Sequence, residues 1–216
     1  MSAPSIEPFN NYQTETMAEP KRATARAEEK QFAVFDAAAD VFARYGFKRT
    51  TMNDIAEAAG ISRPALYLMF DNKEHLFHEL AAYRINLAMD AATSVLAEEG
   101  KVNDRFINAL MIFEKVYTEP VANSPHGEEL IDVNLNLASD VMAEGHGRLV
   151  ATLTEVLQEA DKGGEVSFEN SAMSHQAFVE LLLSSIKGIK KMANSKEEYR
   201  EQTRQVALIF LKTISA

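Results

Sequence analysis

One segment of this sequence, Thr51–Phe70 or TMNDIAEAAGISRPALYLMF, holds an arginine that could read a base in DNA. The planar guanidinium of Arg63 can donate two hydrogen bonds at once to O6 and N7 of a guanine in the major groove. At the start of the segment, the hydroxyls of Thr50 and Thr51 could hold a phosphate oxygen together with the free amides of a helix N-terminus. This chemistry predicts DNA binding, provided that a helix presents Arg63 to solvent.

The first part of the segment predicts a short helix that ends at a glycine. Thr51 and Asp54 have the spacing of a capping box, in which each side chain accepts a hydrogen bond from the backbone of the other residue. Ile55 and Ala59 share one apolar face. Gly60 then ends the helix, because the left-handed conformation that closes a helix abruptly costs glycine little. Two short helices joined by such a turn form a helix-turn-helix.

The second short helix is predicted to begin after Ser62, which caps it with its hydroxyl. Pro64 falls in the first turn, where a missing N–H breaks no helical bond. Leu66 and Phe70 are four residues apart and can pack on the first helix. The side chains that this packing leaves to face outward are those of Arg63, Ala65, Tyr67 and Met69.

The segments on either side predict two further helices. An apolar stripe that includes Phe35, Phe42 and Tyr45 precedes the segment and ends at Gly46, and a longer helix is expected over residues 73–96. A helical hairpin inside an all-α protein without any link to DNA is the alternative. The surrounding helices favour a three-helix unit with a connecting helix.

Residues 32–80 resemble the N-terminal domain of the TetR family of transcriptional regulators. The family's spacing is kept without a gap in four stretches, A-x-x-x-F-x-x-x-G-F/Y, T-x-x-D-I-A, A-G-I/V-S and L-Y-x-x-F-x-x-K-E. The resemblance implies a homodimer that binds a palindromic operator and represses transcription, and that releases the DNA when a small molecule occupies its C-terminal domain.

The resemblance also implies roles for individual residues. Tyr67 and Lys73 match the family's phosphate-contacting tyrosine and lysine, whereas Pro64 stands where the family often has glycine and Met69 where it often has histidine. A methionine cannot donate a hydrogen bond to phosphate. The expected DNA contacts are Thr50, Thr51, Arg63, Pro64, Ala65, Tyr67 and Lys73.

Composition is compatible with this reading. Residues 20–73 hold nine Lys or Arg and seven Asp or Glu, which gives this segment a net charge of +2. The whole chain of 216 residues has a net charge of −10, so the residues outside the segment carry −12. The absence of cysteine excludes disulfides and thiolate sites. No apolar run reaches the roughly 18 residues of a membrane span. We therefore expect a cytoplasmic protein without a cofactor.

The rest of the chain is helical in pattern, so the predicted fold class is all-α. We expect a flexible tail over residues 1–24, a DNA-binding domain over 25–84 with its motif at 51–70, and a helical effector-binding and dimerisation domain over 85–216. A basic run from Lys21 to Lys30 could reach along the DNA as an arm or be merely solvated. Helices are expected at Asn103–Tyr117, Leu130–Glu144 and Leu149–Ala160, with a loop from Glu119 and a helix stop at Gly145.

Two sets of side chains in this second domain could bind partners. The last two helices are apolar on more than one face, and in the resembling family such helices form the dimer interface. Candidate interface residues are Leu182, Ile186, Val206, Ile209 and Phe210. A pocket for an apolar or aromatic effector could be lined by Phe106, Leu110, Phe113, Tyr117, Met142, His175 and Phe178.

Two other functions compete with that of a repressor. An activator would have the same DNA-binding head, because the sign of regulation depends on where the operator lies. A metal-dependent enzyme could use Glu74, His75, His78 and Glu79, which lie close in sequence. Carboxylate-bridged helical sites need two Glu-x-x-His repeats on separate helices, however, and the sequence has no such pair. We therefore predict that the protein is not an enzyme.

Overall fold

The computed structural model describes residues 19–122 and 124–216, and this part of the chain is all-α, as predicted. The predicted tail at residues 1–24 lies outside it up to residue 18, and the side chains of Lys21, Arg22 and Arg26 also lie outside it. The elements are α1 (Glu19–Tyr45), α2 (Met52–Ala58), α3 (Arg63–Tyr67), α4 (Lys73–Leu96), α5 (Val102–Ala122), α6 (Gly127–Leu137), α7 (Ser139–Lys162), α8 (His175–Met192) and α9 (Lys196–Lys212).

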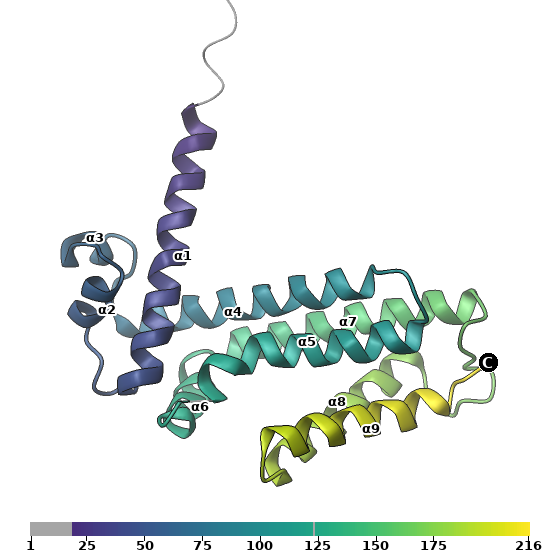
Figure 1. Cartoon of the computed structure of the whole chain (residues 1–216). Helices are drawn as coiled ribbons and strands as arrows, with labels where there is room; N and C mark the ends of the chain where they lie inside the picture. Colours follow the sequence, from purple (N-terminus) through teal and green to yellow (C-terminus); the bar gives the residue numbers. More distant parts are fainter. Residues whose placement is uncertain (1–18, 123) are drawn as a thin grey trace, which may run out of the picture.

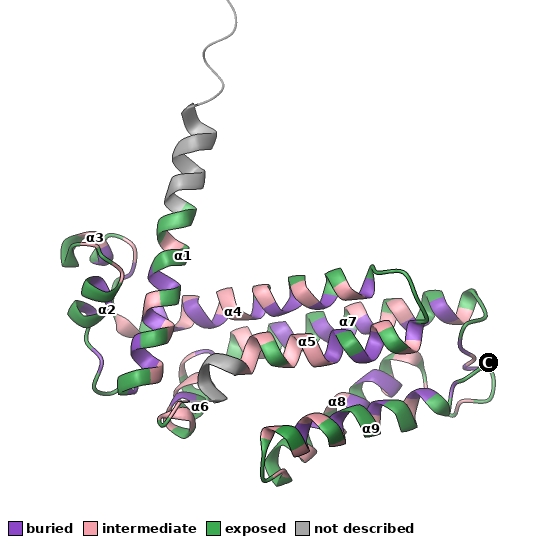
Figure 2. Ribbon diagram, viewed as in Figure 1, coloured by how far each residue is buried: buried purple, intermediate pink, exposed green. Residues whose placement is uncertain are grey.

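Helix α4 connects a small head to a larger body. The head consists of α1, α2, α3 and the start of α4, while α5 and α7 run beside the rest of α4 and α8 and α9 pack against the far side of the body (Figure 1). Each part has its own buried core (Figure 2). Helix α4 passes from one core to the other, since Leu80 belongs to the core of the head and Ile85 to that of the body.

The helix-turn-helix forms as the local sequence predicts. Thr51 and Asp54 make the complete capping box at the start of α2. Gly60 has a φ of +66°, the left-handed conformation expected of it. The hydroxyl of Ser62 accepts a hydrogen bond from the amide of Ala65 at 3.3 Å and so caps α3. Both short helices thus begin at a side-chain cap within three residues, and α2 ends at a glycine.

The predicted helix stop at Gly145 is wrong, because α7 continues through this residue to Lys162. The expected helices at Leu130–Glu144 and Leu149–Ala160 are instead divided at Ala138 into α6 and α7. Gly145 is buried against α4, and a Cβ atom there would lie 2.7 Å from Cγ2 of Ile85. The glycine therefore allows α4 and α7 to approach closely and does not end a helix.

The predicted start of a loop at Glu119 is also wrong, because α5 continues to Ala122 through Pro120, whereas residues 124–126 lie between the helices as expected. Proline has no N–H, so the carbonyl of Val116, four residues earlier, loses its partner within the helix. The guanidinium of Arg84 on α4 donates to this carbonyl instead. A hydrogen bond from a neighbouring helix thus replaces the helical bond that Pro120 cannot make, and α5 continues past the residue at which the sequence pattern predicts its end.

Helix α6 and the loop before it hold the C-terminal end of α1. The hydroxyl of Ser124 donates to the carbonyl of Ala43 at 2.6 Å, and Oε1 of Glu129 accepts the backbone N–H of Lys48 at 2.8 Å. Between these bonds lies Gly46, with a φ of +79°, and a Cβ atom there would collide with the Glu129 carboxylate. Leu130 of α6 is also buried in the core of the head. The body therefore contacts the head at a second place besides α4.

Comparison of Gly46→Ala with Gly60→Ala should separate the stability contributed by the contact between Gly46 and Glu129 from the cost of backbone strain. Both glycines have a positive φ, so either change should cost about 1–2 kcal/mol of unfolding free energy. Gly46→Ala should cost about 1 kcal/mol more, because Glu129 must move and release the Lys48 amide, whereas no atom lies within 4 Å of a Cβ at Gly60. Urea denaturation measures both values.

The extra cost of Gly46→Ala should disappear when it is measured in a Glu129→Ala background. Equal losses for the two glycine variants in the natural background would contradict the proposed packing between Gly46 and Glu129.

Candidate nucleic-acid interface

Helix α3 lies at the end of the head and is held there by two buried side chains. Leu66 is fully buried and Phe70, just after the helix, is 2% exposed. The ring of Phe70 lies 5.6 Å from that of Phe35 on α1. The outer surface of α3 does not pack against the body, and it is the side of the molecule that a duplex could approach (Figure 1).

Arg63 and Tyr67 form a pair on the exposed surface of α3. They are four residues apart, both are exposed, and the Arg63 guanidinium lies 5.5 Å from the centre of the Tyr67 ring. This cation–π contact restrains a flexible side chain without using its hydrogen-bond donors. Within the part of the chain that the structure describes, no N–H group of Arg63 donates a hydrogen bond, so these donors are available to a ligand.

The prediction that Met69 faces outward is not supported, because Met69 is only partly exposed and packs against the core of the head. The next residue towards the N-terminus, Leu68, is instead 89% exposed. Ala65 is also half-buried. Leu68 keeps helical backbone angles, with a φ of −74° and a ψ of −20°, so the helical arrangement extends through it. Helical spacing places residue 68 opposite the buried Leu66, so this periodicity is the signal that could have found Leu68.

Thr51 is exposed at the start of α2, but its hydroxyl already makes two hydrogen bonds. It donates to Oδ2 of Asp54 at 2.8 Å and accepts the Asp54 N–H at 3.3 Å. The backbone N–H of Thr51 also donates to this carboxylate, and these bonds lower the pKa of Asp54, the backbone bond most. A negative charge therefore lies beside the hydroxyl that was expected to hold phosphate.

Thr50 lies in a position that differs from the prediction. Its side chain is 2% exposed, and its hydroxyl donates to the carbonyl of Gly46 at 2.7 Å. A buried hydroxyl that already donates one bond cannot reach a phosphate without a change of the link between α1 and α2. The side chain of Thr50 shapes this link.

Lys73 also bonds to the link between α1 and α2. Its Nζ donates to the carbonyls of Phe47 and Thr50 at 2.7 and 2.8 Å, and it lies 4.3 Å from the centre of the Phe47 ring. Two of the three N–H groups of the ammonium are thus used within the protein. Lys73 thus fixes the link in front of α2.

The residues predicted to line an effector pocket lie mostly in the core of the body. Phe106 and Phe178 are fully buried and Leu110 is 5% exposed, while Phe113 and Tyr117 are half-buried against the same core. His175 bonds Oδ2 of Asp161 at 2.9 Å. Met142 is half-buried on α7. The structure thus uses this set largely for packing.

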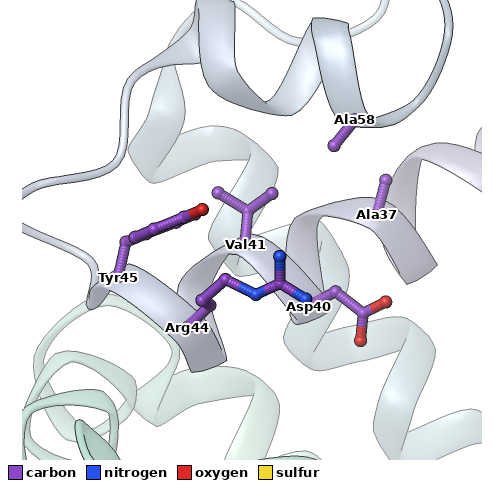
Figure 3. Close-up of a pocket in the computed structure, with 6 residues that line it drawn as sticks. All are labelled: Ala37, Asp40, Val41, Arg44, Tyr45 and Ala58. Carbon is purple, nitrogen blue, oxygen red and sulfur yellow. The ribbon is translucent and has the colours of Figure 1, made fainter.

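Two surface hollows do not include any of these residues. The first, of about 190 Å³, lies in the head between α1 and α2, where Arg44, Tyr45 and Ala58 surround it (Figure 3). The second, of about 230 Å³, lies where the turn between α8 and α9 meets α5, beside the ion pair of Lys190 and Glu114. Both are open and shallow, so neither is the enclosed apolar pocket that the sequence predicts.

The residues predicted for a dimer interface divide into two groups. Leu182 and Ile186 are buried within the chain, which removes them from an interface, and Val206 and Phe210 are half-buried. Ile209 is 64% exposed. Leu181 and Leu208, which the prediction omitted, are about half exposed. The exposed large apolar side chains of α8 and α9 are therefore Leu181, Met192, Leu208 and Ile209.

The histidines at the start of α4 make contacts typical of structural residues. His75 accepts the Asp71 N–H, and His78 bonds the carboxylate of Asp140 on α7 at 3.1 Å. The bond to Asp140 raises the pKa of His78. Among the described residues, His, Asp and Glu side chains do not gather in any group of three that could hold a metal.

Residues 34–80 match the profile of the family described as "Bacterial regulatory proteins, tetR family". The chain is 31% identical over 157 residues to the probable acrEF/envCD operon repressor of Escherichia coli (strain K12), covering 68% of this chain and 69% of that protein. The transcriptional regulator TtgR of Pseudomonas putida is 40% identical over 60 residues, 28% of this chain and 29% of its own. The family and these relatives are transcriptional regulators and not enzymes.

Solved structures share the fold of most of the chain. A regulator from Mesorhizobium loti that is ascribed to the TetR family superposes with a TM-score of 0.70 at 20% identity, over 88% of this chain and 99% of its own. SmeT, the repressor of a multidrug efflux pump of Stenotrophomonas maltophilia, superposes with a TM-score of 0.61 at 15% identity, over 86% and 90%. Within residues 19–122 and 124–216, no helix is long and apolar enough to cross a membrane.

Replacement of Lys73 by methionine tests whether this residue acts within the head. The change removes two charge-assisted hydrogen bonds to the link, so the unfolding free energy should fall by about 1.5–3 kcal/mol. Lys48→Met is the matched control, because that side chain is exposed on the same link. Urea denaturation of both variants measures the difference. Unchanged stability, with a salt dependence of DNA binding reduced by about one ion, would instead assign Lys73 to phosphate.

Proposed function

This chain belongs to the TetR family of bacterial regulatory proteins, and we propose that it is a repressor that binds a palindromic operator as a homodimer and releases it when a small molecule binds the body. The observation that carries this proposal is the exposed surface of α3, on which Arg63 is held by Tyr67 at the end of the head. A regulator of this kind acts on the chromosome, so the proposal includes a cytoplasmic location.

Charge supports a binding mode that relies on a few placed contacts. The head carries a net charge of about +2 and the rest of the chain −12. An acidic body repels the phosphate backbone, so attraction to DNA of any sequence should be weak. Affinity must then come from base contacts and from the simultaneous binding of two heads.

The exposed apolar side chains of α8 and α9 support dimerisation through these helices. Leu181, Leu208 and Ile209 lie far along the chain from the head, and burial of such side chains between two copies would remove them from water. A symmetric dimer presents two copies of α3, and helix-turn-helix dimers read half-sites about 34–36 Å apart. This spacing makes the operator palindromic.

Effector binding in the body can act on the head along two connections. Helix α4 runs through both cores, and α6 contacts the link between α1 and α2 through Glu129. A small molecule that changed the packing of α4 or α6 would alter the separation of the two heads, and thus the fit to both half-sites. The core of the body consists of apolar and aromatic side chains, which favours an apolar or aromatic effector.

Replacement of Arg63 by alanine should remove sequence discrimination. We expect a loss of about 1–3 kcal/mol on the cognate operator and little loss on random duplex DNA, because a guanine contact is specific. Fluorescence anisotropy with both duplexes measures the two affinities. Arg148→Ala, an exposed arginine on α7, is the control and should bind as the natural protein does. Equal losses on both duplexes would assign Arg63 to the phosphate backbone.

Replacement of Ile209 by glutamate should prevent dimerisation. A charge within an apolar interface is costly to bury, so the variant should be monomeric at micromolar concentration and should lose operator affinity at least tenfold. Ile131→Glu is the matched control, since Ile131 is similarly exposed but lies on α6. Analytical ultracentrifugation measures the mass, and circular dichroism verifies the fold. A dimeric Ile209→Glu variant would exclude this surface as the interface.

A further inference from the structure

We propose that Leu68, together with Pro64, recognises the 5-methyl group of a thymine in each half-site of the operator. This inference rests on the proposed DNA-binding function and adds a second specificity-determining contact to that of Arg63. It concerns a residue that is absent from the DNA contacts predicted from the sequence.

The backbone brings Leu68 and Pro64 onto one face of α3. Leu68 closes the helix with a φ of −74° and a ψ of −20°, which are helical values, and its N–H donates to the carbonyl of Pro64 at 3.1 Å. Residues four apart in this conformation lie one above the other. Arg63 and Tyr67 form the neighbouring pair in the same way. The exposed surface of α3 thus has one polar pair beside one apolar pair.

Leu68 is not used for packing within the chain. It is 89% exposed, the largest exposed fraction among the exposed large apolar side chains of the described residues, and it belongs to neither core. Its neighbours Leu66 and Phe70 are buried, so the short helix is already held without it. A leucine that points away from the head, beside the arginine of a recognition helix, is available to a bound duplex.

The chemistry of the major groove identifies what this apolar pair can recognise. Neither a proline ring nor a leucine side chain can donate or accept a hydrogen bond. The base edges in the major groove present hydrogen-bonding groups, except for the C5 methyl group of thymine, which is apolar. Contact between Leu68 and this methyl removes apolar surface from water on both sides. The operator half-site should therefore contain a thymine near the guanine that Arg63 contacts.

Replacement of thymine by uracil removes only this methyl group and leaves base pairing intact. The operator is first selected from a random-sequence duplex library with the full-length protein, and each thymine of the half-site is then replaced by deoxyuridine in turn. At one or two positions the affinity should fall about fourfold, as expected for the loss of one buried methyl group. Leu68→Ala should bind the thymine and uracil duplexes equally at those positions.

The controls separate this inference from the proposed function. Leu135→Ala, an exposed leucine on α6, should keep the preference for thymine over uracil. An operator that depends on Arg63 but has no sensitive thymine would overturn the role of Leu68 alone. The same conclusion follows if uracil weakens the natural protein and Leu68→Ala equally, because the effect would then come from DNA shape. Failure to select any duplex would overturn the proposed function itself.

Discussion

The burial of Leu66 and Phe70 is the contact on which the DNA-binding surface depends. Helix α3 has only five residues, and a helix of this length is not stable by itself in water. Its conformation is maintained because these two side chains lie in the core formed with α1 and α2. The burial of these two side chains turns the opposite face of α3 to solvent, and this face consists of Arg63, Pro64, Tyr67 and Leu68. The stability of the head and the geometry of recognition thus have the same origin.

The link between α1 and α2 is the place where the body can influence this surface. Thr50 and Lys73 bond to the backbone of the link from within the head, and Glu129 bonds to it from α6. Two side chains that the sequence predicts as phosphate contacts are therefore used to fix the position of α2. Because α3 packs against α2, a shift of α6 would change the position of the recognition helix through the bond between Glu129 and the link.

An acidic body and an almost neutral head give the protein a particular balance of specificity and affinity. Weak general attraction to DNA makes each base contact a larger share of the binding free energy. The pairing of Arg63 with Tyr67 and of Pro64 with Leu68 would then let a helix of five residues distinguish guanine and thymine from other bases. The simultaneous binding of the two heads of a dimer supplies the affinity that a single short helix lacks.

The sequence alone determined the helix-turn-helix and the bounds of α4, because caps and turns depend on residues at most four apart. The capping box of Thr51 and the left-handed Gly60 are of this kind. Tertiary structure decided whether Gly145 ends a helix and whether Leu182 is buried. Each of these depends on a side chain distant in sequence, as Gly145 depends on Ile85, and local periodicity does not contain that information.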